Sequence, residues 1–218
     1  LSNNSTIVFN GEIYNYLTLR TKLETMGYEF ITKSDTEVIL KLYEEYGTSS
    51  FKMLDGMFAF SIYDAITKKV YCVRDFFGEK PLYYFADDQT IGWASELKSL
   101  IPLKDLKPSI DSTALGLYFR LTYIPAPFTI YSGVYKLEPN HYLTINTESY
   151  TVEKHPIVQN IKPQKVETKE QAIRYTRDKV MESVGSRSVS DVPLASFLSG
   201  GVDSSIISFC LAQFQPQP

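Results

Sequence analysis

The fold is decided by the stretch Phe58-Ala59-Phe60-Ser61-Ile62-Tyr63 and by Val70-Tyr71-Cys72-Val73 shortly after it. In the first run large apolar side chains alternate with smaller or more polar ones, and this period of two residues is typical of a β-strand with one buried face. Lys68 and Lys69 lie in the connection, so the second run predicts the returning strand of a hairpin. We expect the two strands to pair antiparallel.

Further strands and helices are expected around this hairpin. Residues 6–9 form a short β-rich run, which the turn signal Asn10-Gly11 would end. Residues 82–94 predict a second hairpin, and residues 134–145 supply more strand. The whole predicts an antiparallel, tyrosine-rich sheet with helices gathered at its start.

Two helices are expected before the sheet and one within it. Asn15 is placed to cap the first helix. Ser34 and Glu37 have the spacing of a capping box that opens the second, which Gly47 would stop. Residues 111–119 predict the third.

Composition excludes several classes of protein. Of the 218 residues 44% are hydrophobic and 22% are charged, and the net charge is only -3, which argues against binding to nucleic acid or to an anionic membrane surface. No apolar run approaches the ~20 residues of a membrane helix, and no signal peptide is visible at the start. Cys72 and Cys210 cannot make a disulfide framework, so we expect a cytoplasmic protein.

The chain changes character after residue 150. Residues 151–167 contain two prolines and little periodicity, which indicates an interdomain linker. Thr168 and Gln171 have the spacing of another capping box, which opens a helix. The apolar run 193–198 predicts a short buried strand before a glycine-rich loop and a last helix. We therefore expect one domain over residues 1–150 and the start of another over residues 168–218.

The loop after this strand is Ser199-Gly200-Gly201-Val202-Asp203-Ser204-Ser205. The glycines let an anion approach the backbone, and the helix start offers unpaired N–H groups at the positive end of its dipole. Asp203 would repel a bare phosphate, so it fits a metal ion or a helix cap better. An ordinary capped turn would explain Ser-Gly-Gly alone.

The complete order of strand, double glycine, Asp-Ser-Ser and helix resembles the pyrophosphate loop of the ATP pyrophosphatase superfamily. Enzymes of this superfamily cleave ATP between its α and β phosphates to activate a carboxylate or carbonyl. The resemblance implies that ATP binds with Mg²⁺ near Asp203. The implied ATP-binding residues are Leu198, Ser199, Gly200, Gly201, Val202, Asp203, Ser204 and Ser205.

A second cluster is Phe9-Asn10-Gly11-Glu12-Ile13-Tyr14-Asn15. A side-chain amide beside a glycine at a strand end can present two N–H donors to one point, as an oxyanion hole requires. A simple Asn-Gly turn would explain the same pair. Asp35 is open to two interpretations as well, since it could stabilise the first turn of its helix or accept a substrate ammonium.

The order of motifs along the chain resembles that of the glutamine-dependent asparagine synthetases. The motifs lie at residues 10–15, 34–40, 54–60, 74–84 and 94–98. The resemblance implies an α+β fold, in which an incomplete amidotransferase domain of the N-terminal-nucleophile type has layered antiparallel sheets with helices. It also implies that the first strand, loop and helix of an α/β adenine-nucleotide-binding domain follow.

The resemblance further implies roles for four residues. Asn10 and the backbone of Gly11 would stabilise the oxyanion, and these two with Glu12 and Asp35 would hold glutamine, Asp35 at its α-ammonium. Ammonia released through a cysteinyl thioester would pass through a tunnel. Aspartate would react with ATP to give β-aspartyl-AMP, from which ammonia would displace AMP to give asparagine. A homodimer is left open as the assembly.

The chain departs from this family in its cysteines. The family nucleophile is an N-terminal cysteine, whereas Cys72 is expected within a strand and Cys210 on an apolar helix face. An internal cysteine cannot supply the α-amino group that acts as the general base. We therefore expect that parts of both domains lie outside this chain, and that residues 1–218 alone are inactive.

Three alternatives stay open from the sequence. One is an amidotransferase that modifies a cell-surface sugar or peptide, and another is a ligase similar to β-lactam synthetase. The third is a non-catalytic dimerisation module with the amidotransferase fold. The loop at 199–205 argues against the third, and retention of Asn10, Gly11, Glu12 and Asp35 argues against the second.

Overall fold

The computed structural model describes residues 5–87, 90–103, 109–158, 163, 165–188, 190 and 192–214. Its internal contacts divide the chain into two units, Leu1–Gln159 and Asn160–Pro218. The described part of the first unit contains two antiparallel sheets with helices, whereas that of the second contains two helices. The α+β class with layered antiparallel sheets is confirmed for the first unit.

The predicted hairpin lies within a five-stranded antiparallel sheet. It consists of β2 (Gly56–Asp64) and β3 (Lys69–Arg74). β1 (Ser5–Ile13) pairs with the other side of β2, while β7 (His141–Asn146) and then β8 (Val152–Pro156) extend the sheet beyond β3. The order is therefore β1-β2-β3-β7-β8.

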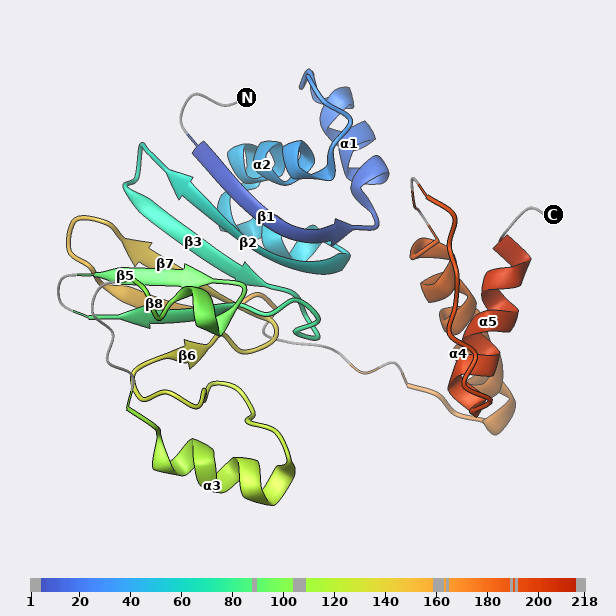
Figure 1. Ribbon diagram of the computed structural model, residues 1–218. Coiled ribbons are helices and arrows are strands. Elements are labelled where there is room, and N and C mark those ends of the chain that lie inside the picture. The colour runs from blue at the N-terminus through green and yellow to red at the C-terminus, as the bar shows by residue number, and fades with distance from the viewer. Residues whose placement is uncertain are drawn as a thin grey trace. The chain divides into compact units, whose positions relative to one another are not determined.

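Helices cover one face of this sheet. They are α1 (Tyr16–Thr25), α2 (Asp35–Tyr46) and the 3-10 helix η1 (Gly47–Met53), and Figure 1 shows α1 and α2 beside β1 and β2. Phe58 and Phe60 of β2 point into this core. Their alternation along the strand is the period of two residues that predicted it.

A second, three-stranded sheet packs on the other face. Its order is β5 (Ile91–Ala94), β4 (Tyr83–Ala86) and β6 (Tyr135–Lys136). The 3-10 helix η2 (Leu97–Ser99) and α3 (Ser112–Leu121) follow β5 in the chain. The buried layer between the two sheets contains side chains from the first sheet and from residues that flank the strands of the second. They are Ala59, Val70, Cys72, Leu82, Leu137, Leu143 and Ile145.

β8 corrects the expected start of the linker at residue 151. Val152 lies opposite Ile145 and Pro156 opposite His141, so this segment belongs to the sheet of the first unit. Pro156 is the last residue of β8, the outermost strand. Proline has no backbone N–H, and its absence at the edge of a sheet removes the fewest hydrogen bonds between strands. How far the linker extends stays a prediction, because residues 159–162 and 164 lie outside the described residues.

The second unit corrects the strand expected at residues 193–198. Its helices are α4 (Lys169–Ser186), whose cap Thr168 accepts from Gln171 N, and α5 (Val202–Phe214). Residues 193–198 form no strand, because a strand needs a neighbour for its N–H and C=O groups and the described residues offer none here. Phe197 is 99% exposed. The predicted strand-loop-helix is therefore a loop and a helix.

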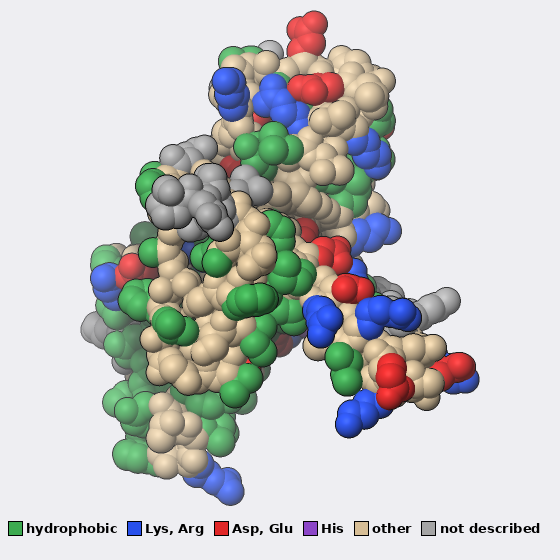
Figure 2. All heavy atoms as spheres, turned by 90° about the vertical axis from the view of Figure 1, so that its right-hand side faces the viewer, with side chains coloured by type: hydrophobic (Ala, Val, Ile, Leu, Met, Phe, Trp, Pro, Cys, Tyr) green, Lys and Arg blue, Asp and Glu red, His purple; other side chains and the backbone are tan. Residues whose placement is uncertain are grey.

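Hydrophobic side chains are numerous on the surface of the chain. Figure 2 shows one face, on which they gather in patches between charged side chains. Within the described part of the chain, none of the helices has the length and hydrophobicity needed to cross a membrane.

The capping box at Ser34 forms only in part. Ser34 Oγ accepts from Thr36 N at 3.0 Å, as expected. Glu37, which is buried, instead accepts from Ile31 N at 2.9 Å, Thr32 N at 2.7 Å and the Thr32 hydroxyl at 2.6 Å. Burial raises the pKa of Glu37, but these hydrogen bonds outweigh it and hold the pKa below its ordinary value.

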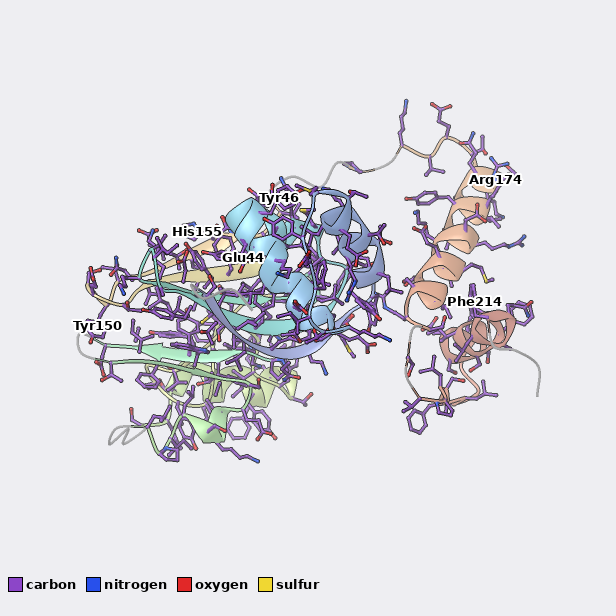
Figure 3. All side chains as sticks on the ribbon, turned by 90° about the horizontal axis from the view of Figure 1, so that it is seen from above. Glu44, Tyr46, Tyr150, His155, Arg174 and Phe214 are labelled. Carbon is purple, nitrogen blue, oxygen red and sulfur yellow. The ribbon has the colours of Figure 1, made fainter. Side chains whose placement is uncertain are left out.

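We expect Glu37 to make the free energy of unfolding depend on pH. Because its pKa is lower in the folded chain, its stabilisation is complete above the ordinary value of 4.5 and is lost as the pH falls toward the folded value. Urea unfolding at about pH 7 and at about pH 3.5 measures how much the free energy of unfolding falls between the two pH values. This decrease should be smaller for Glu37→Gln than for the wild type. Glu44→Gln, an exposed position on α2 (Figure 3), is the control and should behave as the wild type. Equal losses in wild type and Glu37→Gln would contradict this assignment.

Candidate functional site

The predicted amide cluster lies in the second half of β1. Asn10 is opposite Ala59 and Gly11 is opposite Phe58, in a register with β2 that continues to Ile13. The turn expected at Asn10-Gly11 is therefore wrong, and the strand passes through both residues.

Glycine is required at this point because the two strands approach closely. A Cβ on Gly11 would lie 2.1 Å from Met57 O, and a Cβ on Gly56 would lie 2.1 Å from Glu12 O. Gly11 has φ of 151°. A glycine inside a strand often marks such a close backbone approach. The Asn10-Gly11 pair, which suggested a turn in the sequence, is therefore explained by the close packing of two strands.

Two hydrogen bonds show where the N–H groups of β1 point. Tyr14 N donates to Asp55 O at 2.7 Å, on the β2 side, whereas Ile13 N donates to Asp35 Oδ2 at 3.0 Å. N–H groups alternate in direction along a strand. Gly11 N–H therefore points away from β2, as Ile13 N–H does. Within the described sheet no further strand lies on that side of β1.

Asn10 projects from the same part of β1 toward the second sheet. Its Nδ2 donates to Ser95 Oγ at 3.2 Å, and Ser95 directly follows β5. Asn10 is exposed, and its amide has two N–H groups, so one remains for a ligand. Asn10 Nδ2 and Gly11 N–H are therefore two donors on the same part of β1.

The start of α2 brings Asp35 to the same end of β1. Its Oδ2 accepts from Ile13 N, while its Oδ1 lies 3.5 Å from the Ser34 hydroxyl and 3.4 Å from that of Thr36. The carboxylate is partly exposed. Asp35 therefore binds the backbone of β1 and keeps an oxygen with only long contacts.

Glu12 completes the set of four residues predicted at this site. It lies opposite Met57, and strand alternation places its side chain on the face of β1 that carries Asn10. The side chain is half-buried, and no hydrogen bond to its carboxylate is found in the described part of the chain. The structure thus gathers Asn10, Gly11, Glu12 and Asp35 at one end of β1.

A cavity of about 370 Å³ opens beside Asn10. Its walls come from both sheets and include Ser61, Leu82, Trp93 and Ser95. The volume lies at the lower end of the range for small-ligand sites.

Two charged residues at the end of β3, Arg74 and Asp75, have structural roles that the sequence did not indicate. Asp75 is buried, and at 2.9–3.2 Å its carboxylate accepts from the N–H groups of Phe58, Phe77, Glu79 and Lys80. The Arg74 guanidinium, also buried, donates to the carbonyls of Gly78, Lys80 and Leu137. Burial lowers the pKa of Arg74, and this effect exceeds that of the negative charge of Asp75, which raises it. In the sequence, the sign of these roles is the pair of charged residues that directly follows the apolar run of residues 70–73.

Neither cysteine is in the exposed environment that a nucleophile needs. Cys72 is fully buried in β3, where burial raises the pKa of its thiol. Cys210 is buried in α5. Both are free thiols, as expected of core residues, and buried cysteines in apolar surroundings are poor nucleophiles.

In the second unit the predicted phosphate loop forms the start of α5. Gly200 has φ of 86°, a conformation that favours glycine. Ser199 Oγ and Ser204 Oγ are 2.9 Å apart, and Ser205 Oγ donates to Gly201 O at 2.8 Å. The first N–H groups of a helix have no intrahelical acceptor, so this exposed loop presents donors at the positive end of the helix dipole.

A hollow and one carboxylate lie near the loop in the second unit. A hollow of about 980 Å³ in the second unit is lined in part by Val184, Leu194, Phe197 and Ser204. Asp203 lies in the first turn of α5, and the described residues contain no cluster of three His, Cys, Asp or Glu suited to a metal. A single carboxylate suits Mg²⁺, which is commonly held by one or two carboxylates and by substrate phosphates.

Both units match known families. The family described as glutamine amidotransferase domain matches residues 1–156, and the family described as asparagine synthase matches residues 176–218. The chain is 42% identical over 211 residues to "Asparagine synthetase (glutamine-hydrolyzing) 1" of Bacillus subtilis. The matched region covers 96% of this chain and 33% of that protein. It is 33% identical over 204 residues to "Asparagine synthetase (glutamine-hydrolyzing) 3" of the same organism, covering 93% of this chain and 33% of that protein.

A solved structure supports the fold. The glutamine phosphoribosylpyrophosphate amidotransferase of B. subtilis, complexed with ADP and GMP, matches with a TM-score of 0.51 and 18% identity, covering 98% of this chain and 45% of that chain. At this identity the likeness shows the fold alone. The chain spans about a third of the length of the two curated relatives.

We expect Gly11→Ala to lower the free energy of unfolding by about 2 kcal/mol or more, because the new Cβ would collide with Met57 O. Gly116→Ala in α3 is the matched control. Nothing lies within 4 Å of the added carbon there, so the helix should gain about 0.5–1 kcal/mol. Urea unfolding of both variants measures this. A neutral Gly11→Ala would contradict the close approach of the strands.

Proposed function

Because this chain belongs to the glutamine amidotransferase domain family, we propose that its first unit binds glutamine and stabilises the oxyanion formed when the side-chain amide is hydrolysed. The observation that carries the proposal is the convergence of the Asn10 amide, Gly11 N–H and Asp35 at one end of β1. Negative charge develops on the amide oxygen in the tetrahedral intermediate, and donors fixed in advance stabilise it.

Asp35 and Glu12 supply the negative charge that would recognise the substrate. The α-ammonium of glutamine is a cation, and Asp35 Oδ1 has only the long contacts to Ser34 and Thr36. We assign the ammonium to Asp35 because a charge-assisted hydrogen bond there would be stronger than the contacts it replaces. Glu12 is placed to hold a further polar group of the substrate on the Asn10 face.

We place the nucleophile of this reaction outside residues 1–218. Cys72 and Cys210 are both buried, so neither can reach a substrate at Asn10. Residues 1–218 by themselves should therefore not hydrolyse glutamine. Two free thiols fit a cytoplasmic protein.

The loop at residues 199–205 is proposed to bind the phosphates of ATP. Its backbone N–H groups and the hydroxyls of Ser199, Ser204 and Ser205 would contact them, and the backbone of Leu198 would lie near the adenine. Mg²⁺, held by Asp203 and the phosphates, would neutralise charge on the phosphates. The fit rests on the open helix start and on Gly200 in its positive-φ conformation.

The full-length protein is proposed to form asparagine, as the names of the related proteins indicate. The carboxylate of aspartate would attack the α-phosphorus of ATP and release pyrophosphate, which gives β-aspartyl-AMP. Ammonia from glutamine would then attack the activated carbonyl and release AMP. Glutamine, aspartate and ATP would be the substrates.

The first test is glutamate release from glutamine by the full-length protein. Asn10→Ala should lower kcat about 100-fold, because it removes one oxyanion donor. Asp35→Asn should raise the KM for glutamine about tenfold with a smaller effect on kcat, because it weakens ground-state binding. Glu44→Gln on α2 should leave both parameters unchanged. A full-length wild type without glutaminase activity, or an active Asn10→Ala, would contradict the proposal.

The second test is calorimetric titration of the full-length protein with ATP and Mg²⁺. Asp203→Ala should weaken binding about tenfold when Mg²⁺ is present and should not weaken it when the metal is chelated, because the carboxylate acts through the ion and would repel a bare phosphate. Asp178→Ala on α4 is the matched control, because it also removes an acidic side chain. Absence of ATP binding by the wild type would favour the non-catalytic module.

A further inference from the structure

We propose that Ser95 is a positioning residue, which orients the Asn10 amide for the hydrolysis of glutamine. This inference rests on the proposed role of Asn10 and extends it to a side chain in a different sheet. The observation is the hydrogen bond from Asn10 Nδ2 to Ser95 Oγ at 3.2 Å, between residues 85 positions apart in the sequence.

Both ends of this hydrogen bond belong to fixed backbone. Asn10 is held in β1 by its pairing with β2. Ser95 lies between β5, whose last residue Ala94 is opposite Tyr83, and η2, which Leu100 anchors in a buried cluster. The Ser95 hydroxyl therefore occupies a defined place relative to the backbone of β1.

The Asn10 side chain needs such a partner. It is exposed, and the terminal torsion of an asparagine has a broad energy profile, so the amide can rotate and exchange its oxygen and nitrogen ends. Only the nitrogen end can donate to an oxyanion. In the structure the Ser95 hydroxyl accepts one N–H of Asn10 Nδ2. This hydrogen bond holds the nitrogen end in place and fixes the plane of the amide, which leaves the second N–H in one direction.

The other walls of the neighbouring cavity cannot replace this partner. Leu82 and Trp93 contribute mainly apolar surface there, and no hydrogen bond joins the Ser61 hydroxyl to Asn10 within the described residues. Ser95 acts on Asn10 and not on the substrate. Its effect should therefore appear in the transition state and not in the binding of glutamine.

Kinetics of the full-length protein test this role. Ser95→Ala should lower kcat for glutamine hydrolysis about tenfold, which corresponds to about 1.4 kcal/mol, with KM changed less than about twofold. Ser95→Thr retains the hydroxyl and should retain most of the activity. In an Asn10→Ala background Ser95→Ala should have little further effect, because the group that it orients is gone.

A second measurement tests the contact without activity. In the full-length protein labelled with ¹⁵N, the side-chain amide signals of Asn10 are identified by their loss in Asn10→Ala. Ser95→Ala should shift these signals and Ser95→Thr should return them close to their wild-type positions. Ser99→Ala, an exposed position in η2, should leave them in place.

The outcomes separate this inference from the proposed function. Unmoved Asn10 signals in Ser95→Ala, or an active wild type in which the effects of Ser95→Ala and Asn10→Ala multiply independently, would overturn the role of Ser95 alone. A wild type without glutaminase activity would overturn the proposed function. The inference is supported if the signals move, kcat falls at constant KM and Ser95→Thr restores both.

Discussion

The close antiparallel contact between β1 and β2 is the constraint on which the candidate site depends. With a glycine on each strand, at Gly11 and Gly56, the backbones approach to a distance that a Cβ at either position would prevent. The resulting register directs Gly11 N–H away from β2 and turns Asn10 toward the second sheet. It also directs Ile13 N–H to Asp35, so one pairing places groups from a strand, a helix and a second sheet together.

Buried charge secures the same pairing from the opposite side of β2. Asp75 binds the N–H of Phe58, the residue opposite Gly11, and holds the backbone of the following loop through three more hydrogen bonds. A buried carboxylate is costly unless its oxygens are satisfied, and here each accepts two N–H groups. Arg74 ties the same loop to Leu137. The strand behind Asn10 and Gly11 is thereby held by polar contacts as well as by the apolar core.

The two units differ in how completely their apolar segments are buried. In the first, Phe58 and Phe60 are buried under helices while Ala59 lies between the sheets, so each face of β2 has a partner. In the second, Phe197 stays exposed and its segment forms no strand. An apolar run predicts burial only where another element can supply both a surface and backbone hydrogen bonds. Prediction therefore held for β2 and β3 and failed for residues 193–198.

Local pattern by itself determined the strands β2 and β3, the caps at Ser34 and Thr168, and the glycine-rich start of α5, because alternation, capping and positive φ are properties of neighbouring residues. The four residues at the amide site were also named from sequence, through resemblance to a family. Only the tertiary structure decided that Asn10-Gly11 continues a strand and that Ser95 meets Asn10. The physical reason is that both depend on contacts between segments far apart in the chain, which no local pattern contains.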